Sequence, residues 1–469
     1  LDDTFTEINY MTTGRVYLEV IKRERNLEYK GKNVEVVPDI PLEVIRRIEN
    51  ASEQAGADVT LIEIGGTIGE YQNIIFLEAA RMLKFRKPND VAIVMVSYVP
   101  IPGNIGEMKT KPTQYAARSL NAVGLQADII IARSTTPLDA KRKEKIATFC
   151  NIVKEHVISA PDVKSVYDVP LNFERDRFSE ILIKLLSIKQ ERRGSGLESW
   201  KRFVKKSHNG RKVLKIAVVG KYFDSGDFVL SDAYISVIEA IKFSAYAVNS
   251  KPELTWFDSK EFETGEKPVA ILKQYDGIVV PGGFGKTGVE GIVMAIKYAR
   301  EHKIPYLGLC YGMQWMVVEF ARNVARMKGA NTIEVDEQTP YPVIDIMPDQ
   351  KEKLARKDYG GSMRLGSYPA YLKKGTIARA AYKSEIVDER HRHRFEVNPA
   401  YIERLEKAGL VFSGISPSKK LMEIAELPRA VHPFMLGTQF HPEFKARPLS
   451  PHPLFTAFMQ VASERRARK

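Results

Sequence analysis

Apolar residues of this chain gather in short continuous runs that alternate with segments of helical spacing. In the first half, residues 58–64, 90–99 and 127–132 are rich in Val, Ile and Ala with little polar alternation. Runs of this kind are typical of parallel strands that are covered on both faces. Helical spacing is found over residues 75–83, 142–156 and 172–186. The first half therefore predicts a parallel sheet with helices packed on it.

A second series of the same kind begins after a charged, glycine-bearing stretch at residues 189–196. Its expected strands and helices cover residues 213–220, 277–280 and 306–309, and residues 233–245, 291–301 and 312–324. We therefore predict an α/β fold with two doubly wound domains whose sheets are mainly parallel. The first domain is expected over residues 1–186, a linker over 187–212 and the second domain over 213–469.

Composition narrows the classes of protein that the chain resembles. Its 469 residues include two cysteines, Cys150 and Cys310, which are too few for a disulfide framework. No apolar run approaches the roughly 18 residues that cross a bilayer, and the first ten residues carry acids rather than a secretory signal. We therefore expect a cytoplasmic protein with no membrane partner.

The formal net charge is +13, and it is spread along the chain rather than concentrated in one long basic block. Aromatic residues are not interleaved with the basic ones as they are in proteins that bind single-stranded nucleic acid. We therefore predict small polyanions such as nucleoside triphosphates as ligands, and no nucleic acid.

Cys310 stands in the most informative pentapeptide of the chain, G-L-C-Y-G at residues 308–312. A strand-like run leads into this sequence and an apolar helical segment leaves it, which is the layout of a nucleophile elbow. The glycines allow a sharp turn beside the nucleophile, and the N-terminus of the helix favours the reactive thiolate. Taken alone, the pattern is also compatible with a buried cysteine at a tight turn.

A base and a carboxylate lie near the C-terminus, at His441 and Glu443, and Pro442 stiffens the link between them. Glu443 is suited to hold the imidazole in one orientation, although such a pair also fits a strand end at the surface. A third element is the glycine-rich turn at residues 281–285. Its backbone N–H groups predict an oxyanion hole together with the amide of Tyr311, and a plain loop is the alternative.

These three elements, in the order glycine turn, cysteine elbow and His-x-Glu, resemble a class I glutamine amidotransferase domain over about residues 213–460. The resemblance implies that Cys310 is the nucleophile, His441 the general base and Glu443 the group that orients the base. It assigns the binding of glutamine and its oxyanion to Gly283, Tyr311, Gly312, Met313, Gln314, Glu334 and Arg394.

The first half of the chain is similar to the CTP synthase family. The similarity is carried by TTGRVY at residues 12–17, EIGGTIG at 63–69 and GEMKTKPTQ at 106–114, and in the second half by GGSMRLG at 360–366 and RHRHRFEVN at 390–398. The resemblance implies that ATP phosphorylates the 4-oxygen of UTP and that ammonia from L-glutamine displaces phosphate to give CTP. The first domain is then a synthase domain related to P-loop folds.

The same resemblance assigns site residues in the first half. It places UTP and CTP at Glu70, Tyr71, Gln72, Lys109, Thr110, Lys111, Pro112, Thr113, Gln114 and Lys145, and ATP at Asp162 and Val163. Glu63 precedes a glycine turn and is the expected Mg²⁺ ligand, because this hard cation prefers oxygen. From residue type alone, the lysines are equally compatible with a solvated surface.

The resemblance further implies GTP as an allosteric activator that acts through residues 360–366. It also implies a homotetramer, with filaments as a further assembly.

The phosphate-binding loop that opens CTP synthases is not found in this sequence, which contains no G-x-x-x-x-G-K-[ST] pattern. The chain begins shortly before Thr12, and we therefore expect the N-terminal ATP loop to be missing from it. Two alternatives to a CTP synthase stay open. One is a stand-alone glutaminase or γ-glutamyl hydrolase, and the other is an inactive scaffold or filament subunit.

Overall fold

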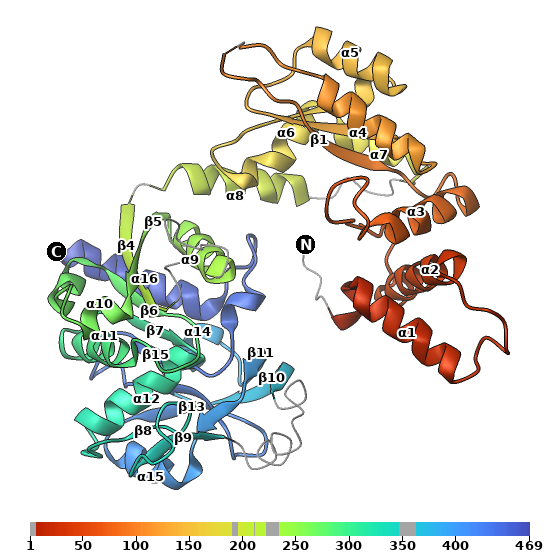
Figure 1. The fold of residues 1–469 in the computed structure, drawn as a ribbon. Helices are drawn as coiled ribbons and strands as arrows, with labels where there is room; N and C mark the ends of the chain where they lie inside the picture. The colour runs from red at the N-terminus through yellow and green to blue at the C-terminus, as the bar shows by residue number, and fades with distance from the viewer. Residues whose placement is uncertain (1–5, 105, 190–195, 211, 222–233, 347–362) are drawn as a thin grey trace. The chain divides into compact units, whose positions relative to one another are not determined.

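The computed structural model describes residues 6–104, 106–189, 196–210, 212–221, 234–346 and 363–469. The chain divides into two compact units, Leu1–Ser195 and Gly196–Lys469 (Figure 1). The boundary falls inside the stretch that the sequence predicts as a linker. Immediately after it, helix α8 (Gly196–His208) buries Phe203 and Val204, so part of the expected linker is a helix of the second unit.

The first unit opens with a group of helices that pack on one another. These are α1 (Thr13–Arg25), α2 (Val36–Ala55) and α3 (Ile74–Arg86). Their apolar faces meet in a cluster that includes Val16, Val20, Val44 and Ile75. Helix α3 confirms the helical spacing expected over residues 75–83.

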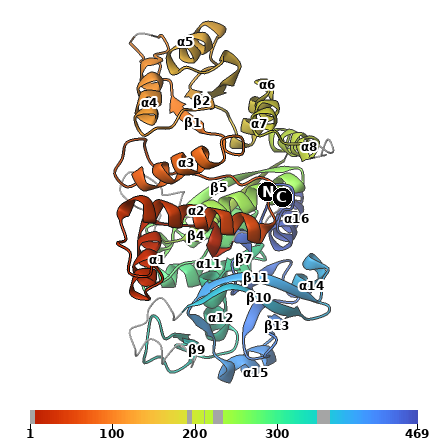
Figure 2. The ribbon, with the colours of Figure 1, turned by 90° about the vertical axis from the view of Figure 1, so that its right-hand side faces the viewer.

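A parallel sheet forms the rest of the first unit. Its strands are β1 (Val94–Tyr98), β2 (Ile129–Ser134) and β3 (Val157–Pro161), and its helices are α4 (Lys111–Ala122), α5 (Ala140–Cys150), α6 (Val169–Arg175) and α7 (Phe178–Leu185). The strand order is β1-β2-β3, and both pairings are parallel. Ile130 packs toward α4 and α5, whereas its neighbour Ile131 packs toward α6 and α7. Helices therefore cover both faces of β2 (Figure 2).

Three expectations for the first unit are wrong. Residues 58–64 do not form a strand, and Leu61 is 80% exposed. A strand requires a hydrogen-bonded neighbour, and the described strands of this unit pair only with one another. Strand β1 is not buried on both faces, because Val96 and Tyr98 are exposed. The expected helix over 172–186 is also divided, at Arg177, whose φ of 58° lies in the left-handed region.

The second unit is larger and is built on a mixed sheet. Its strands are β4 (Lys212–Gly220), β5 (Ser250–Asp258), β6 (Gly277–Val280), β7 (Tyr306–Leu309), β10 (Arg364–Leu372), β11 (Ile386–His393), β13 (Val411–Ile415), β14 (Met422–Glu426) and β15 (Met435–Thr438). The strand order is β11-β10-β13-β14-β15-β7-β6-β4-β5. The five strands from β15 to β5 are parallel, and the remaining pairings are antiparallel.

Helices and a small second sheet complete this unit. The helices are α9 (Ile235–Ala247), α10 (Ser259–Glu263), α11 (Val289–Glu301), α12 (Tyr311–Asn323), α14 (Ile377–Tyr382), α15 (Pro399–Lys407) and α16 (Pro453–Arg468), with short 3₁₀ turns η5 (Val269–Gln274) and η6 (Pro442–Lys445). The small sheet has the order β12-β9-β8, from β8 (Asn331–Thr332), β9 (Pro342–Ile346) and β12 (Phe395–Val397).

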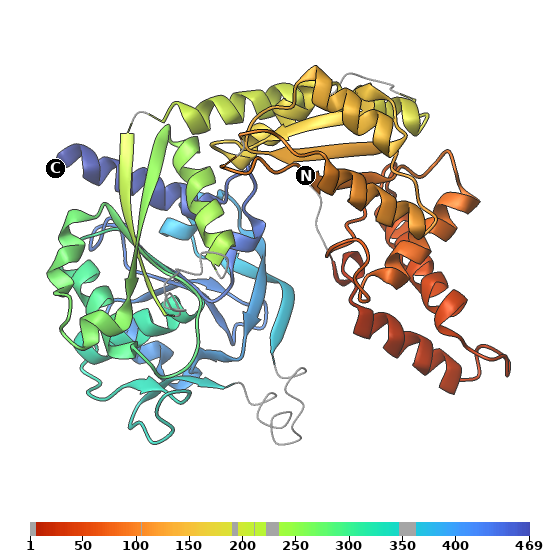
Figure 3. The ribbon, with the colours of Figure 1, turned by 45° about the horizontal axis from the view of Figure 1, so that its top comes forward.

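The parallel strands of the second unit are covered on both faces (Figure 3). A Cβ atom built on Gly277 would meet Phe458 of α16, whereas the next residue, Ile278, packs into a core with Ile292 of α11 and Trp315 of α12. Successive residues of a strand point to opposite faces, so α16 and the pair α11–α12 lie on opposite sides of the sheet. The predicted α/β class with mainly parallel sheets is confirmed.

Candidate active site

Cys310 lies between the end of β7 and the beginning of α12. Its backbone has φ 49° and ψ −96°, which is a strained conformation for a residue with a side chain. Such a turn at the end of a buried strand directs the side chain away from the sheet edge. The thiol is 6% exposed, and the backbone N–H donates to the Thr438 carbonyl of β15. The elbow expected from the sequence is therefore present.

The two glycines of the elbow are required by close packing. A Cβ atom on Gly312 would lie 2.3 Å from the carbonyl oxygen of Val280, the last residue of β6. One on Gly308 would lie 2.7 Å from the carbonyl carbon of Gly312. Any side chain at either position would separate α12 from the strands, so this sequence pattern has a steric cause.

His441 and Glu443 form a buried pair next to the elbow. The Nδ1 atom of His441 lies 2.7 Å from an oxygen of Glu443, and the two residues are 8% and 6% exposed. Burial lowers the pKa of His441, but the charges on Glu443 and Cys310 and their hydrogen bonds raise it well above its ordinary value. The raised pKa favours a protonated His441 imidazole beside the sulfur of Cys310.

Two buried glutamines form a chain of hydrogen bonds that ends at the thiol. Gln439 donates from Nε2 to the sulfur of Cys310 over 3.7 Å. Gln314, in the first turn of α12, donates to the Gln439 side-chain oxygen over 3.4 Å and to the Phe395 carbonyl over 3.0 Å. Gln314 therefore holds the group that contacts the sulfur. The sequence had assigned Gln314 to glutamine binding and did not single out Gln439.

The glycine-rich turn lies beside the pair and is held by three side chains. Lys221 donates to the Gly285 carbonyl over 2.6 Å and to the Tyr311 hydroxyl over 2.8 Å, and Tyr311 also donates to the Gly285 carbonyl over 2.6 Å. Glu334 accepts the Gly285 N–H over 2.8 Å. Burial lowers the pKa of Lys221 to about 8. A Cβ atom on Gly282 would lie 2.9 Å from the His441 ring, so this turn and the base are in contact.

The other residues predicted for glutamine occupy different surroundings. Met313 is fully buried in the apolar core, and Gly283 lies against the Tyr311 ring. Arg394 is half-buried between β11 and β12. Residues 360–362, which belong to the segment expected to respond to GTP, lie outside the described residues.

In the first unit, the predicted nucleotide residues lie near one edge of the sheet. Parallel strands place their carboxyl ends together, and loops at that edge bind ligands in open α/β sheets. Thr110 precedes α4, which contains Lys111, Pro112, Thr113 and Gln114, and Lys145 lies on α5. Asp162 directly follows β3, and Val163 follows Asp162. These residues therefore belong to segments that follow three parallel strands.

A basic group surrounds Glu107 in this unit. Lys109 lies 2.8 Å from the Glu107 carboxylate, and Arg142 lies 3.9 Å from it. The hydrogen bond from Lys109 lowers the pKa of Glu107, and the charges of Arg142 and Lys145 lower it further. The structure therefore brings Lys109 and Lys145 close to one carboxylate. Arg142 is a further cation of this group that the sequence analysis did not name.

The remaining candidates of the first unit are exposed or half-buried. Tyr71 is 95% exposed, and Gln72 donates to Glu70 over 2.5 Å. Glu63 lies on the segment that is not a strand, and its carboxylate has no hydrogen bond or ion pair with the described residues. No group of three or more metal-binding side chains occurs in the described parts of the chain. Glu63 thus offers a single carboxylate, which suits a Mg²⁺ ion whose other ligands are phosphates and water.

Comparison with known proteins identifies both units. Residues 1–188 match the family model described as CTP synthase N-terminus, and residues 229–461 match glutamine amidotransferase class-I. A CTP synthase from Thermococcus gammatolerans is 47% identical over 99% of this chain and 85% of its own length. One from Caldanaerobacter subterraneus is 46% identical over 98% of this chain and 84% of its own length. The chain belongs to the CTP synthase family.

A solved structure of the glutaminase domain of a Trypanosoma brucei CTP synthase, with bound acivicin, is 38% identical and covers 54% of this chain and 94% of its own length, with a TM-score of 0.49. Membership of the CTP synthase family makes the chain a carbon–nitrogen ligase of pyrimidine biosynthesis with a glutaminase half-reaction. It does not favour the stand-alone hydrolase or the inactive scaffold. Among the described helices, none is long and apolar enough to span a membrane.

Proposed function

We propose that the chain aminates UTP to CTP with ammonia that its second unit releases from glutamine, at the expense of ATP. The observation that carries the proposal is the buried Cys310–His441–Glu443 arrangement in a chain that matches CTP synthases over nearly its whole length. We expect the intact protein, supplied with UTP, ATP, Mg²⁺ and glutamine, to form CTP and glutamate in equal amounts. Glutamate release without CTP under these conditions would contradict the proposal.

The roles that we propose in the glutaminase half follow from the contacts of the three residues. The Cys310 thiolate attacks the side-chain amide carbon of glutamine, and the C–N bond breaks as His441 gives its proton to the departing ammonia. His441 then takes a proton from water, which attacks the thioester and releases glutamate. Glu443 keeps the His441 ring oriented with its other nitrogen, Nε2, available to the sulfur.

The negative charge that develops on the amide oxygen requires fixed hydrogen-bond donors. We propose that backbone N–H groups of the glycine-rich turn and of Tyr311 supply them. Lys221, Tyr311 and Glu334 hold both polar groups of Gly285, which supports a rigid turn. Gly283 and Gly312 belong to this proposal through their backbones. Glu334 and Arg394 stay predicted contacts of glutamine.

Tyr311→Phe tests the support of this turn. The change removes the hydroxyl that bonds Lys221 and the Gly285 carbonyl, so the turn should lose part of its fixed geometry. We expect glutaminase kcat to fall about fivefold to tenfold with little change in KM, which is the scale of one hydrogen bond made to the transition state. Tyr298→Phe, which alters a hydroxyl on α11 with a 3.5 Å bond to Ala270, is the matched control. Equal kcat in Tyr311→Phe and the control would show that the hydroxyl does not position the turn.

In the first unit, we propose that the polar and basic group after β1 and β2 binds UTP and its product CTP. Its positive charge near Glu107 supports binding of a triphosphate. Glu70, Tyr71 and Gln72 are proposed to contact the same nucleotide, and Asp162 and Val163 to contact ATP. Glu63 would hold Mg²⁺ together with nucleotide phosphates, and the ion would neutralise charge on the phosphates.

Lys109→Ala and Lys145→Ala test the UTP site separately. Each change removes one cation from a triphosphate-binding group, so each should weaken UTP and CTP binding by about 1–3 kcal/mol. Calorimetry measures this directly, with Lys22→Ala on α1 as an exposed lysine control. Unchanged affinity in both variants would show that Lys109 and Lys145 are solvated surface residues that do not bind the nucleotide.

Regulation, assembly and location are proposed from family membership. We propose that GTP is an allosteric activator and that Mg²⁺ is the metal. We also propose that the chain assembles into a homotetramer, and that tetramers assemble further into filaments. The cytoplasm stays the predicted location, which is supported by the two cysteines being free thiols.

A further inference from the structure

A cavity of about 1130 Å³ lies in the second unit, at the opposite edge of its sheet from Cys310. Its wall includes Pro305, which directly precedes β7, and Pro433, which precedes β15. Cys310 and His441 instead follow the carboxyl ends of these two parallel strands. The strands have four residues each, so about 13 Å of sheet separates the two edges, at roughly 3.3 Å a residue. The cavity is therefore distinct from the candidate active site.

Positive charge dominates the wall of this space, which we call the basic cavity. Seven of its lining residues are Lys or Arg, and Glu464 is the single acidic one. The basic residues come from separate segments: Lys273 from η5, Lys303 from the turn after α11, Arg429 from the loop after β14, and the others from the end of α16. Cations at the end of α16 complement the helix dipole, but this effect does not account for Lys273, Lys303 and Arg429.

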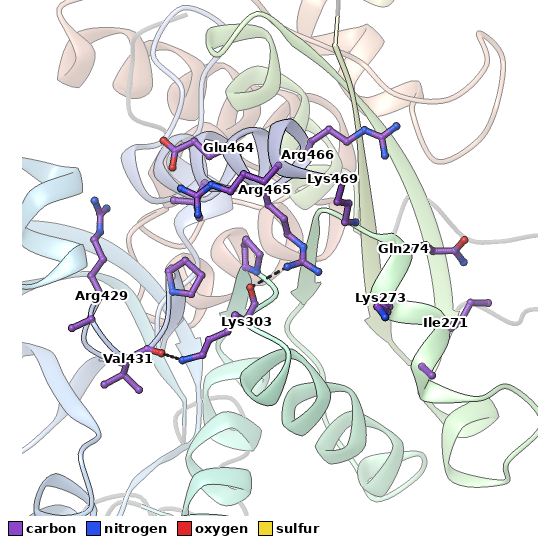
Figure 4. A pocket seen from close by; sticks show the side chains of 16 residues that line it. Ile271, Lys273, Gln274, Lys303, Arg429, Val431, Glu464, Arg465, Arg466 and Lys469 are labelled. Carbon is purple, nitrogen blue, oxygen red and sulfur yellow. Dashed lines mark hydrogen bonds between the residues drawn. The ribbon is translucent and has the colours of Figure 1, made fainter.

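Few acceptors compensate these charges. Lys469 forms an ion pair with Asp276 at 3.3 Å, and Lys303 donates to the Val431 carbonyl. Arg465 reaches from α16 to the Lys303 carbonyl at 3.4 Å (Figure 4). The Nε atom of Arg465 is buried and has no acceptor among the described residues. Arg429 likewise forms no hydrogen bond or ion pair with the described residues. Burial lowers the pKa of Arg465 and Lys469, so an anion in the cavity would stabilise both.

The form of the site indicates the chemistry of its ligand. Cations that converge on a concave space from several segments fit a small, multiply charged anion better than an extended polymer. Guanidinium groups match phosphate oxygens in pairs, and Arg465 Nε lacks such an oxygen. We propose that the basic cavity binds a polyphosphate group, with Arg429, Arg465 and Lys303 as its principal contacts. Ile271 and Val461 add apolar wall on which a nucleoside carrying that group would rest.

The test is calorimetric titration of the intact protein with inorganic tripolyphosphate. The double variant Arg429→Gln/Arg465→Gln should bind tripolyphosphate at the cavity at least about tenfold more weakly, or lose one binding site per chain, because two charge-assisted contacts are removed. The matched control Lys373→Gln/Lys407→Gln removes the same charge from exposed positions elsewhere in the unit and should bind like the unaltered protein. Both double variants should keep glutaminase activity.

A single variant distinguishes a binding contact from a folding defect. A second ligand distinguishes a nucleotide from an inorganic anion. Arg429→Gln alone alters an exposed side chain without bonded partners, so weaker binding with an unchanged unfolding temperature supports a contact rather than a folding defect. ATP that binds this site more tightly than tripolyphosphate would identify a nucleotide as the source of the group, and equal affinity would identify an inorganic one. Three outcomes would overturn the proposal: equal affinity of both double variants for tripolyphosphate, absence of a tripolyphosphate site in the unaltered protein, or binding of polyglutamate instead of tripolyphosphate at the basic cavity.

Discussion

Cys310→Ala is expected to abolish the release of ammonia from glutamine, with a loss of more than about 10⁴-fold in kcat/KM, the scale on which loss of a covalent nucleophile acts. The reason is chemical, because only the sulfur at the elbow can form the glutamyl thioester. The chain has one other cysteine, Cys150, which is buried in the first unit. A coupled assay for glutamate measures the loss.

The change should leave the fold and the synthase half intact. The thiol contributes side-chain contacts with Gln439 and His441, and alanine is small enough for the turn. We therefore expect an unfolding temperature close to that of the unaltered protein and CTP formation from added ammonia at the unaltered rate. Glutaminase activity near the original level would show that the elbow is structural. Loss of ammonia-dependent synthesis together with glutaminase activity would instead indicate a general folding defect.

The sequence predicted the elements around Cys310 with high accuracy. The bounds expected for β6 and β7 coincide with those in the structure, because each is a short apolar run with a proline at one end: Pro281 follows β6 and Pro305 precedes β7. The elbow was recognisable because its two glycines lie only two residues before and two residues after the nucleophile. His441 and Glu443 were recognisable because they are two residues apart on one rigid segment.

The errors have a common physical cause: the local sequence pattern does not specify contacts between residues that are distant in the sequence. Residues 58–64 have the composition of a buried strand, but composition cannot supply the neighbour that a strand must pair with. Helix α8, which lies within the expected linker, was not recognised as a helix because its few apolar residues, among them Phe203, are buried by packing partners distant in the sequence.

Lys221 was missed for a related reason. It is a single lysine at the end of a strand, and its contacts with Gly285 and Tyr311 lie 64 and 90 residues away. Gln439 was quoted only as part of the motif around His441. No spacing rule would have found either residue. The signal that distinguishes them is burial of a polar side chain against the elbow, and only the fold provides that signal.

Glu443→Gln is the second change with a large expected effect, and it acts on the charge of its neighbour rather than on the nucleophile. In the structure, the Glu443 carboxylate raises the pKa of His441 against the effect of burial, which lowers it. An uncharged amide of the same size removes the raising effect. The imidazole should then lose its proton at a lower pH, and the positive charge beside the Cys310 sulfur is lost with it. We expect glutaminase kcat/KM to fall by about 10²–10⁴-fold, the range for losing the group that orients a catalytic histidine.

The decisive measurement is the rate of Cys310 alkylation by iodoacetamide against pH, because it reports the thiolate without catalysis. Because its pKa is raised, His441 keeps its positive charge above neutral pH in the unaltered protein, and a positive charge beside a sulfur favours the reactive thiolate. In Glu443→Gln the imidazole should lose this charge at a lower pH, so alkylation at pH 7 should slow by about tenfold. Glu403→Gln, which alters an exposed carboxylate on α15 paired with Lys407, is the matched control and should leave the profile unchanged. An identical profile in both variants would show that Glu443 does not set the charge of His441, and its proposed role would then be wrong even if activity fell.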